Sequence, residues 1–123
     1  MEAEDIFEGM PSRVKVGCFW WNVVVVSDKE ADIANYWGAT QPQHLTISLR
    51  QSISDPSQLA NTFIHEVLHA IHYVFGLISA DQDDSSPSPT EEEYTTLGAN
   101  GLLAFWQDNP EAVEWWKNLI YKA

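Results

Sequence analysis

The stretch NTFIHEVLHAIHYVFGL, residues 61–77, carries the clearest helical periodicity in this sequence of 123 residues. Start and stop signals frame it. Ser54 or Asp55 can cap the first turn, and Pro56 fits the first helical position. Gly76 supplies the stop. The pattern predicts one long helix whose apolar face is formed by Leu59, Phe63, Val67, Ala70, Ile71 and Val74.

Four polar residues interrupt this apolar helix: His65, Glu66, His69 and His72. Residues four apart lie on one helix face, so His65 and His69 can place two imidazole nitrogens about 2.0–2.1 Å from a single zinc ion. Glu66 is turned by about 100° from His65, where it can reach a water on the metal instead. His72 lies roughly 10 Å along the axis from His65, which is too far to share the ion comfortably. The spacing predicts a zinc site at His65 and His69, with a structural or surface role for His72 and a role behind the ligands or at the substrate as its alternative.

A catalytic zinc keeps three protein ligands, so one more is needed outside this helix. His44 is one candidate, and the run of Glu91, Glu92 and Glu93 is the other. A carboxylate is favoured electrostatically, because a zinc ion held by neutral imidazoles keeps its full double charge among apolar side chains. Helical phase places Glu91 nearest the core, with Glu92 and Glu93 on its flanks. Periodicity therefore leaves the third ligand open.

The segments before the long helix predict strands. Residues 13–27 are β-branched and aromatic, which suits one strand, or two joined at Gly17 or at residues 21–22. Within such a strand, Trp20 and Trp21 face opposite sides. Residues 44–53 alternate like a half-buried strand, and the residues between the two segments form a short helical turn or loop.

The segments after the long helix predict a loop and two more helices. Residues 79–90 are polar and interrupted by prolines. One helix then reaches about Asp108, and a second follows Pro110. Strands followed by helices predict an α+β fold in a single domain, residues 1–123, with residues 1–12 as a candidate disordered segment.

The composition excludes several classes of partner. Eighteen acidic residues against six basic ones give a formal charge of −12, which repels nucleic acids and anionic membranes. Cys18 is the single cysteine and cannot form an internal disulfide, and its apolar neighbours predict a small buried side chain. No signal peptide and no apolar run of membrane-spanning length is found, so we expect a cytoplasmic protein.

The motif helix IHEVLHAI, the acidic start of the next helix and the stretch GANGLLAFWQDNP together resemble a known family. They are similar to the small gluzincin-type zinc metallopeptidases encoded by phages and prophages, which have a minimal zincin fold. The resemblance runs from about residue 45 to residue 110. It implies zinc ligands at His65, His69 and Glu92, and the cytoplasm of a phage host as the location.

The same resemblance implies how a substrate binds and what the protein does. A strand beside the metal helix pairs with an extended peptide, and HLTISLR, with Ile47–Arg50 as the docking edge, is the natural occupant of that place. We expect a zinc-dependent peptidase with Glu66 as general base. The alternatives are a catalytically silent zincin-fold protein that binds a host or phage protein, and a closed structural metal site completed by His44 or His72.

Overall fold

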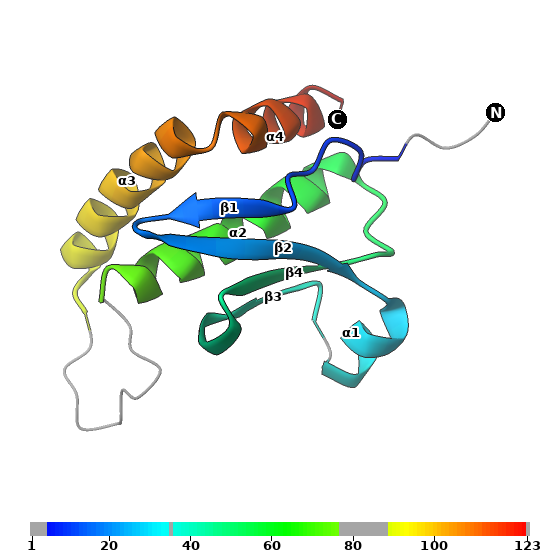
Figure 1. Ribbon diagram of the computed structural model, residues 1–123, viewed down its shortest axis with the longest axis horizontal. Helices are drawn as coiled ribbons and strands as arrows, with labels where there is room; N and C mark the ends of the chain where they lie inside the picture. The colour runs from blue at the N-terminus through cyan, green and yellow to red at the C-terminus, as the bar shows by residue number, and fades with distance from the viewer. Residues whose placement is uncertain (1–4, 35, 77–88, 123) are drawn as a thin grey trace.

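The computed structural model describes residues 5–34, 36–76 and 89–122, and these form an α+β fold (Figure 1). Four strands, a short helix and a 3-10 turn precede the motif helix, and two helices follow it. In chain order the elements are β1 (Arg13–Val16), β2 (Phe19–Val26), α1 (Asp28–Ala34), β3 (Gly38–Gln41), the 3-10 turn η1 (Pro42–His44), β4 (Thr46–Arg50), α2 (Pro56–Val74), α3 (Glu91–Asp108) and α4 (Pro110–Lys122).

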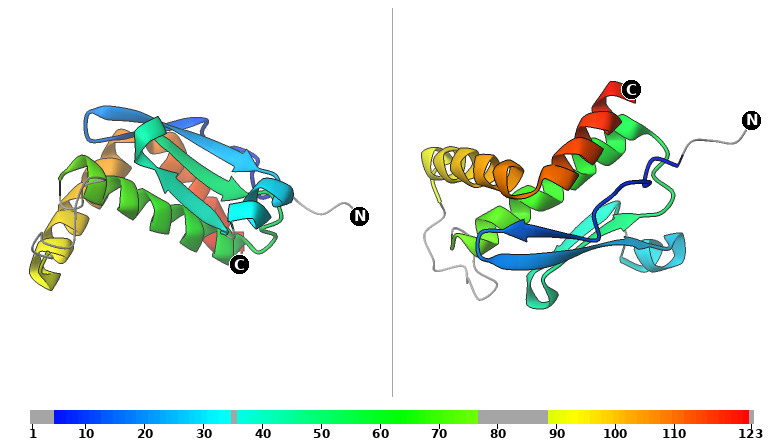
Figure 2. Two further views of the ribbon diagram at one scale, coloured as in Figure 1. Left: turned by 90° about the horizontal axis from the view of Figure 1, so that it is seen from below. Right: turned by 45° about the horizontal axis from the view of Figure 1, so that its top comes forward.

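The four strands form one mixed sheet in the order β1-β2-β4-β3. The two outer pairs are antiparallel, and β2 and β4 in the middle are parallel. The helix α2 lies along one face of this sheet, and α3 and α4 pack against α2 (Figure 2). The mostly antiparallel sheet on a motif helix, with two C-terminal helices, agrees with the α+β prediction.

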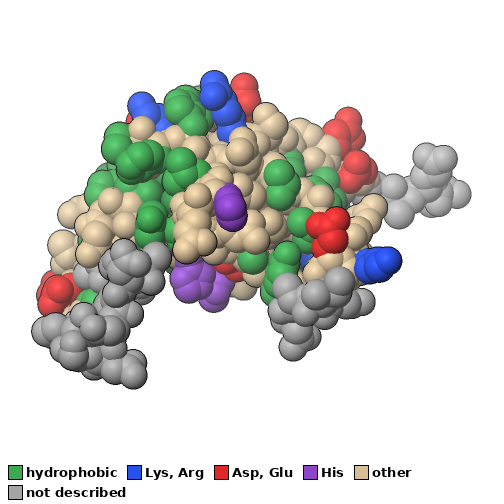
Figure 3. All heavy atoms as spheres, turned by 60° about the horizontal axis from the view of Figure 1, so that its bottom comes forward, with side chains coloured by type: hydrophobic (Ala, Val, Ile, Leu, Met, Phe, Trp, Pro, Cys, Tyr) green, Lys and Arg blue, Asp and Glu red, His purple; other side chains and the backbone are tan. Residues whose placement is uncertain are grey.

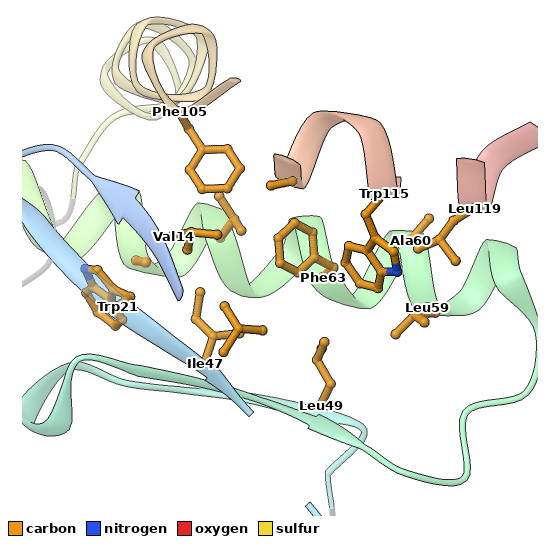
Figure 4. Packing of buried hydrophobic residues seen from close by; sticks show 14 of the residues in the cluster. Val14, Trp21, Ile47, Leu49, Leu59, Ala60, Phe63, Phe105, Trp115 and Leu119 are labelled. Carbon is orange, nitrogen blue, oxygen red and sulfur yellow. The ribbon is translucent and has the colours of Figure 1, made fainter. Parts of the chain in front are cut away.

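The core lies between the sheet and the three long helices (Figure 4). Trp21 is fully buried whereas Trp20 is 47% exposed, so the prediction that these two residues face opposite sides is confirmed. Phe63 of α2 packs edge-on against Trp115 of α4, with ring centroids 5.1 Å apart. Large buried side chains come from the sheet, from α2 and from the two C-terminal helices: Val14, Trp21, Ile47, Leu49, Leu59, Phe63, Phe105 and Leu119.

The ends of the helices match the sequence signals. Asp55 caps α2 by accepting a hydrogen bond from the backbone N–H of Gln58 at 3.1 Å, and Pro56 is the first helical residue. Gly76 has a φ of +80°, a conformation that glycine adopts without strain, and it lies just past the end of α2. The break between α3 and α4 falls at Asn109, as predicted.

Two predictions about the sheet are wrong. The region after β2 contains the strand β3, which was not predicted and which lies at the end of the sheet. The strand β4, whose residues Ile47–Arg50 were expected to form a docking edge, is instead paired on both sides, with β2 and with β3. An extended peptide cannot pair with β4, because its backbone groups are already used in the sheet.

Two predictions near the N-terminus are also corrected. Cys18 is exposed, because it lies in the turn after Gly17, where φ is +61° and the chain reverses between β1 and β2. Residues 5–12 are not disordered: Ile6 is only 8% exposed, and its carbonyl accepts a hydrogen bond from the Trp115 indole at 3.0 Å. Residues 1–4 and most of the predicted 79–90 loop lie outside the described residues.

No helix among the described residues has the length and apolar character needed to cross a membrane.

Candidate metal centre

His65 and His69 face the same point on the exposed side of α2. Their Nε2 atoms are 3.1 Å apart, and their rings meet nearly edge to face with centroids 4.8 Å apart. Two nitrogens bound tetrahedrally to one zinc ion at the usual bond length are separated by about 3.3 Å. The two nitrogens are within hydrogen-bond distance of each other, and the same separation is close to that of two ligand positions on a zinc ion. Histidine side chains reach the surface in the space-filling view (Figure 3).

Glu66 differs from the two histidines in being buried. The residue is 6% exposed, whereas the side chain of His65 is 63% exposed. Glu66 Oε1 accepts a hydrogen bond from the Thr40 hydroxyl at 2.8 Å, and Oε2 lies 4.0 Å from His65 Nε2. A buried carboxylate needs such a donor, because burial without one is costly. One oxygen is held by the strand β3 and the other lies on the side of the histidine.

A shallow cleft opens between the start of β3 and the exposed side of α2. Its lining includes His65 and Glu66, together with Trp37, Gly38, Asn61 and Thr62. Trp37 is 47% exposed, and the guanidinium of Arg50 lies over its ring, 4.8 Å from the centroid. The candidate metal ligand and the candidate base thus share one cleft with the last strand of the sheet.

The acidic run at the start of α3 lies apart from this cleft. Glu93 belongs to a capping box with Thr90, in which Glu93 Oε1 accepts the Thr90 backbone N–H at 3.4 Å. Glu92 Oε1 accepts a hydrogen bond from the Thr96 hydroxyl at 3.2 Å. Glu92 and Glu93 line a different, mostly apolar hollow between α3 and Phe75.

The structure thus brings together two of the three predicted ligands. Within residues 5–34, 36–76 and 89–122, no third histidine, cysteine, aspartate or glutamate joins His65 and His69 in a group that could hold a metal. Binding through Glu92 would require a rearrangement that brings its carboxylate to the pair. His44, the other candidate, is exposed in the η1 turn between β3 and β4.

His72 packs against α3. Its ring lies nearly edge to face on Tyr94, with centroids 5.1 Å apart. Desolvation by burial, and then the nearby His69, lower the pKa of His72 below its ordinary value. Both causes favour the neutral ring, which suits a packing contact between α2 and α3.

Thr40 and Gly38 contact the candidate base, and the sequence did not reveal either of them as a site residue. Both lie on β3, in a short segment with no alternation of apolar and polar residues. Their importance comes from contacts with α2, which is 16 or more positions further along the chain. No local pattern in a single sequence carries such a signal.

Comparison of this chain with protein-family models, with curated proteins and with solved structures finds no match.

Proposed function

We propose that this protein is a zinc-dependent peptidase of the zincin type, with its centre at His65, Glu66 and His69. The observation that carries the proposal is the pair of Nε2 atoms 3.1 Å apart, with a buried carboxylate beside them. Two imidazoles on one helix face with an adjacent glutamate are the arrangement that metal-assisted peptide hydrolysis uses.

His65 and His69 would hold the metal through their Nε2 atoms, with Glu92 as the proposed third ligand. When bound, zinc supplies a Lewis acid that polarises a peptide carbonyl and activates water. Glu66 accepts a proton from the attacking water and gives it to the departing amine nitrogen as the C–N bond breaks. The products are a carboxylic acid and an amine, so Glu66 ends in its starting state.

The strand β3 is the proposed docking edge for an extended peptide. It is the last strand on its side of the sheet, and it lies against the same helix as the histidines. The other outer strand, β1, is less suited, because the side chain of Asn109 already pairs with both the N–H and the C=O of Lys15 at 2.7 Å. A peptide added beside β3 would run along the cleft that contains His65 and Glu66.

Zinc binding is the first test. The purified protein should bind about one zinc per chain, and zinc should raise its melting temperature, since a metal that binds only the folded state stabilises it. His65→Ala and His69→Ala should abolish both effects. His44→Ala, which changes an exposed histidine on the η1 turn, is the matched control and should change neither. A melting temperature that zinc leaves unaltered would sink the proposal.

Glu66→Gln tests the proton transfer. The amide keeps the shape and an oxygen that can accept the Thr40 hydrogen bond, but it cannot take a proton from water. We expect zinc affinity and stability to be retained while cleavage of an internally quenched peptide library is lost. Cleavage at the wild-type rate by this variant would refute the role of Glu66.

A second candidate function is a zincin-fold protein that binds a host or phage protein without cutting it. The exposed aromatic and aliphatic side chains of β2 favour it, since Phe19, Trp20 and Val24 are 46%, 47% and 38% exposed. Hydrophobic side chains gather on one part of the face in Figure 3. Zinc-loaded protein that cleaves no member of a broad peptide library would favour this function over the first.

A further inference from the structure

The strand β3 touches Glu66 with two of its residues. Thr40 is the register partner of the buried Ile47, and Gly38 is the partner of the buried Leu49, so both face α2. The Thr40 hydroxyl lies 2.8 Å from Glu66 Oε1 and 3.0 Å from the backbone oxygen of the same residue. A hydroxyl has one proton, so Thr40 donates to one of these oxygens at a time. Both acceptors belong to Glu66.

Gly38 sets how closely the strand approaches the carboxylate. A Cβ at this position would lie 3.1 Å from Glu66 Cγ, 3.2 Å from Glu66 Oε2 and 2.7 Å from Thr62 Cγ2. A larger residue would therefore displace the Thr62 side chain first and press on the Glu66 side chain as well, or else shift the strand. The backbone of β3 lies directly against the acid because position 38 has no side chain.

These contacts fix the orientation of the carboxylate. Oε1 is held at Thr40, and the side chain is confined by the backbone at Gly38. Oε2 is left on the side of His65, 4.0 Å from its Nε2. Rotation of the carboxylate away from the histidines would break the bond to Thr40 in a site where the acid is almost fully buried.

We propose that Thr40 is a positioning residue, which holds the Glu66 carboxylate with Oε2 directed toward the metal side of the cleft. The catalytic part of this inference rests on the proposed peptidase function. Thr40 lies on the proposed docking edge, so a peptide paired with β3 would stiffen the strand that carries the hydroxyl. Peptide binding and placement of the base are thereby linked through one side chain.

Thr40→Val and Thr40→Ser form a matched pair for the kinetic test. Valine keeps the branched shape without the hydroxyl, and serine keeps the hydroxyl without the methyl group. With a fluorogenic peptide that the wild type cleaves, Thr40→Val should lower kcat by about tenfold to a hundredfold, because a small misplacement of a reacting group has effects of this size. KM and zinc affinity should stay near wild type, and Thr40→Ser should recover most of kcat. Wild-type kcat in Thr40→Val, or no recovery in Thr40→Ser, would overturn the proposal.

A double-mutant cycle in metal-free protein tests the same contact without any activity. Thr40→Val and Glu66→Ala should each lower the urea midpoint, and the double variant should lose less than the sum of the two. Glu66→Gln keeps an acceptor for Thr40, so it should lower the midpoint less than Glu66→Ala does. Additive losses would overturn the positioning role. If the wild type cleaves no peptide, the peptidase function fails, and this cycle still decides whether Thr40 holds Glu66.

Discussion

At the scale of single residues, the third zinc ligand gives the most decisive prediction. Loss of a residue that only hydrogen-bonds to a metal ligand lowers metal affinity by roughly 10–100-fold. Glu92→Gln should lower zinc affinity by more than this, because Glu92 is the proposed ligand itself. Glu91→Gln and Glu93→Gln should have small effects, and glutamine can replace Glu93 in its capping box with Thr90. Competition against a chromogenic chelator measures all three. A dominant loss at Glu91, Glu93 or His44 would reject Glu92 and leave the histidine pair intact.

The residues of the site differ in how far the sequence could predict them. His65 and His69 are four positions apart on a helix with clear periodicity, so local geometry alone predicts that their side chains meet. The contact of Thr40 with Glu66 depends on how β3 is placed against α2, which is a property of the whole fold. Which glutamate of the acidic run could reach the histidine pair depends on how α3 packs against the rest of the fold, so helical phase could not choose among Glu91, Glu92 and Glu93.

At the scale of the elements, two glycines of α3 predict opposite responses to alanine. A Cβ at Gly101 would overlap the side chain of Ile71 on α2, whereas a Cβ at Gly98 would have nothing within 4 Å. Gly98→Ala should stabilise the protein by about 0.5–1 kcal/mol, since alanine favours the helix. Gly101→Ala gains the same propensity but should destabilise by about 1–3 kcal/mol through overpacking.

Urea unfolding of the two glycine variants, followed by circular dichroism, measures the difference. Gly98→Ala serves as the control for the change in helix propensity, because both sites lie inside the same helix. Equal midpoints for the two variants would mean that α3 does not approach α2 as closely as Gly101 indicates.

The long helices were predictable because each carries its own signals. The helix α2 has a cap at Asp55, Pro56 at its first position and Gly76 past its end, and α3 and α4 are separated at Asn109. The strand β3 has only four residues, GATQ, of which none is aromatic and only the threonine is β-branched. It is a strand because β4 pairs with it in the fold. The missing strand explains why β4 was wrongly predicted to be the docking edge.

At the scale of the whole molecule, helices cover one face of the sheet, and the two outer strands differ in how readily an added strand could pair with them. At β1, Asn109 pairs with the backbone of Lys15 and so replaces a neighbouring strand at that point. At β3, the cleft with His65 lies beside the edge. The edge at β1 is thus partly closed by a side chain, and the candidate catalytic residues lie beside the edge at β3. This arrangement favours the pairing of an added strand with β3 only.

The charge of the whole chain predicts how its stability depends on salt. Eighteen acidic and six basic residues leave a formal charge of −12, and repulsion among like charges opposes the compact state. Raising NaCl from 0.01 M to 0.15 M shortens the Debye length from about 30 Å to about 8 Å and screens this repulsion. If screening adds about 1 kcal/mol, the melting temperature of metal-free protein should rise by roughly 3–6 °C. KCl should act like NaCl, because screening depends on ionic strength.

The double variant Glu8→Gln/Asp108→Asn removes two exposed charges away from the cleft. One of them lies at the C-terminal end of α3, where the helix dipole disfavours an acid. This variant should melt at a higher temperature than wild type at low salt, and added salt should raise its melting temperature less. A wild-type melting temperature that falls as salt is added would contradict the prediction, because it would show that attractive ion pairs outweigh the net repulsion.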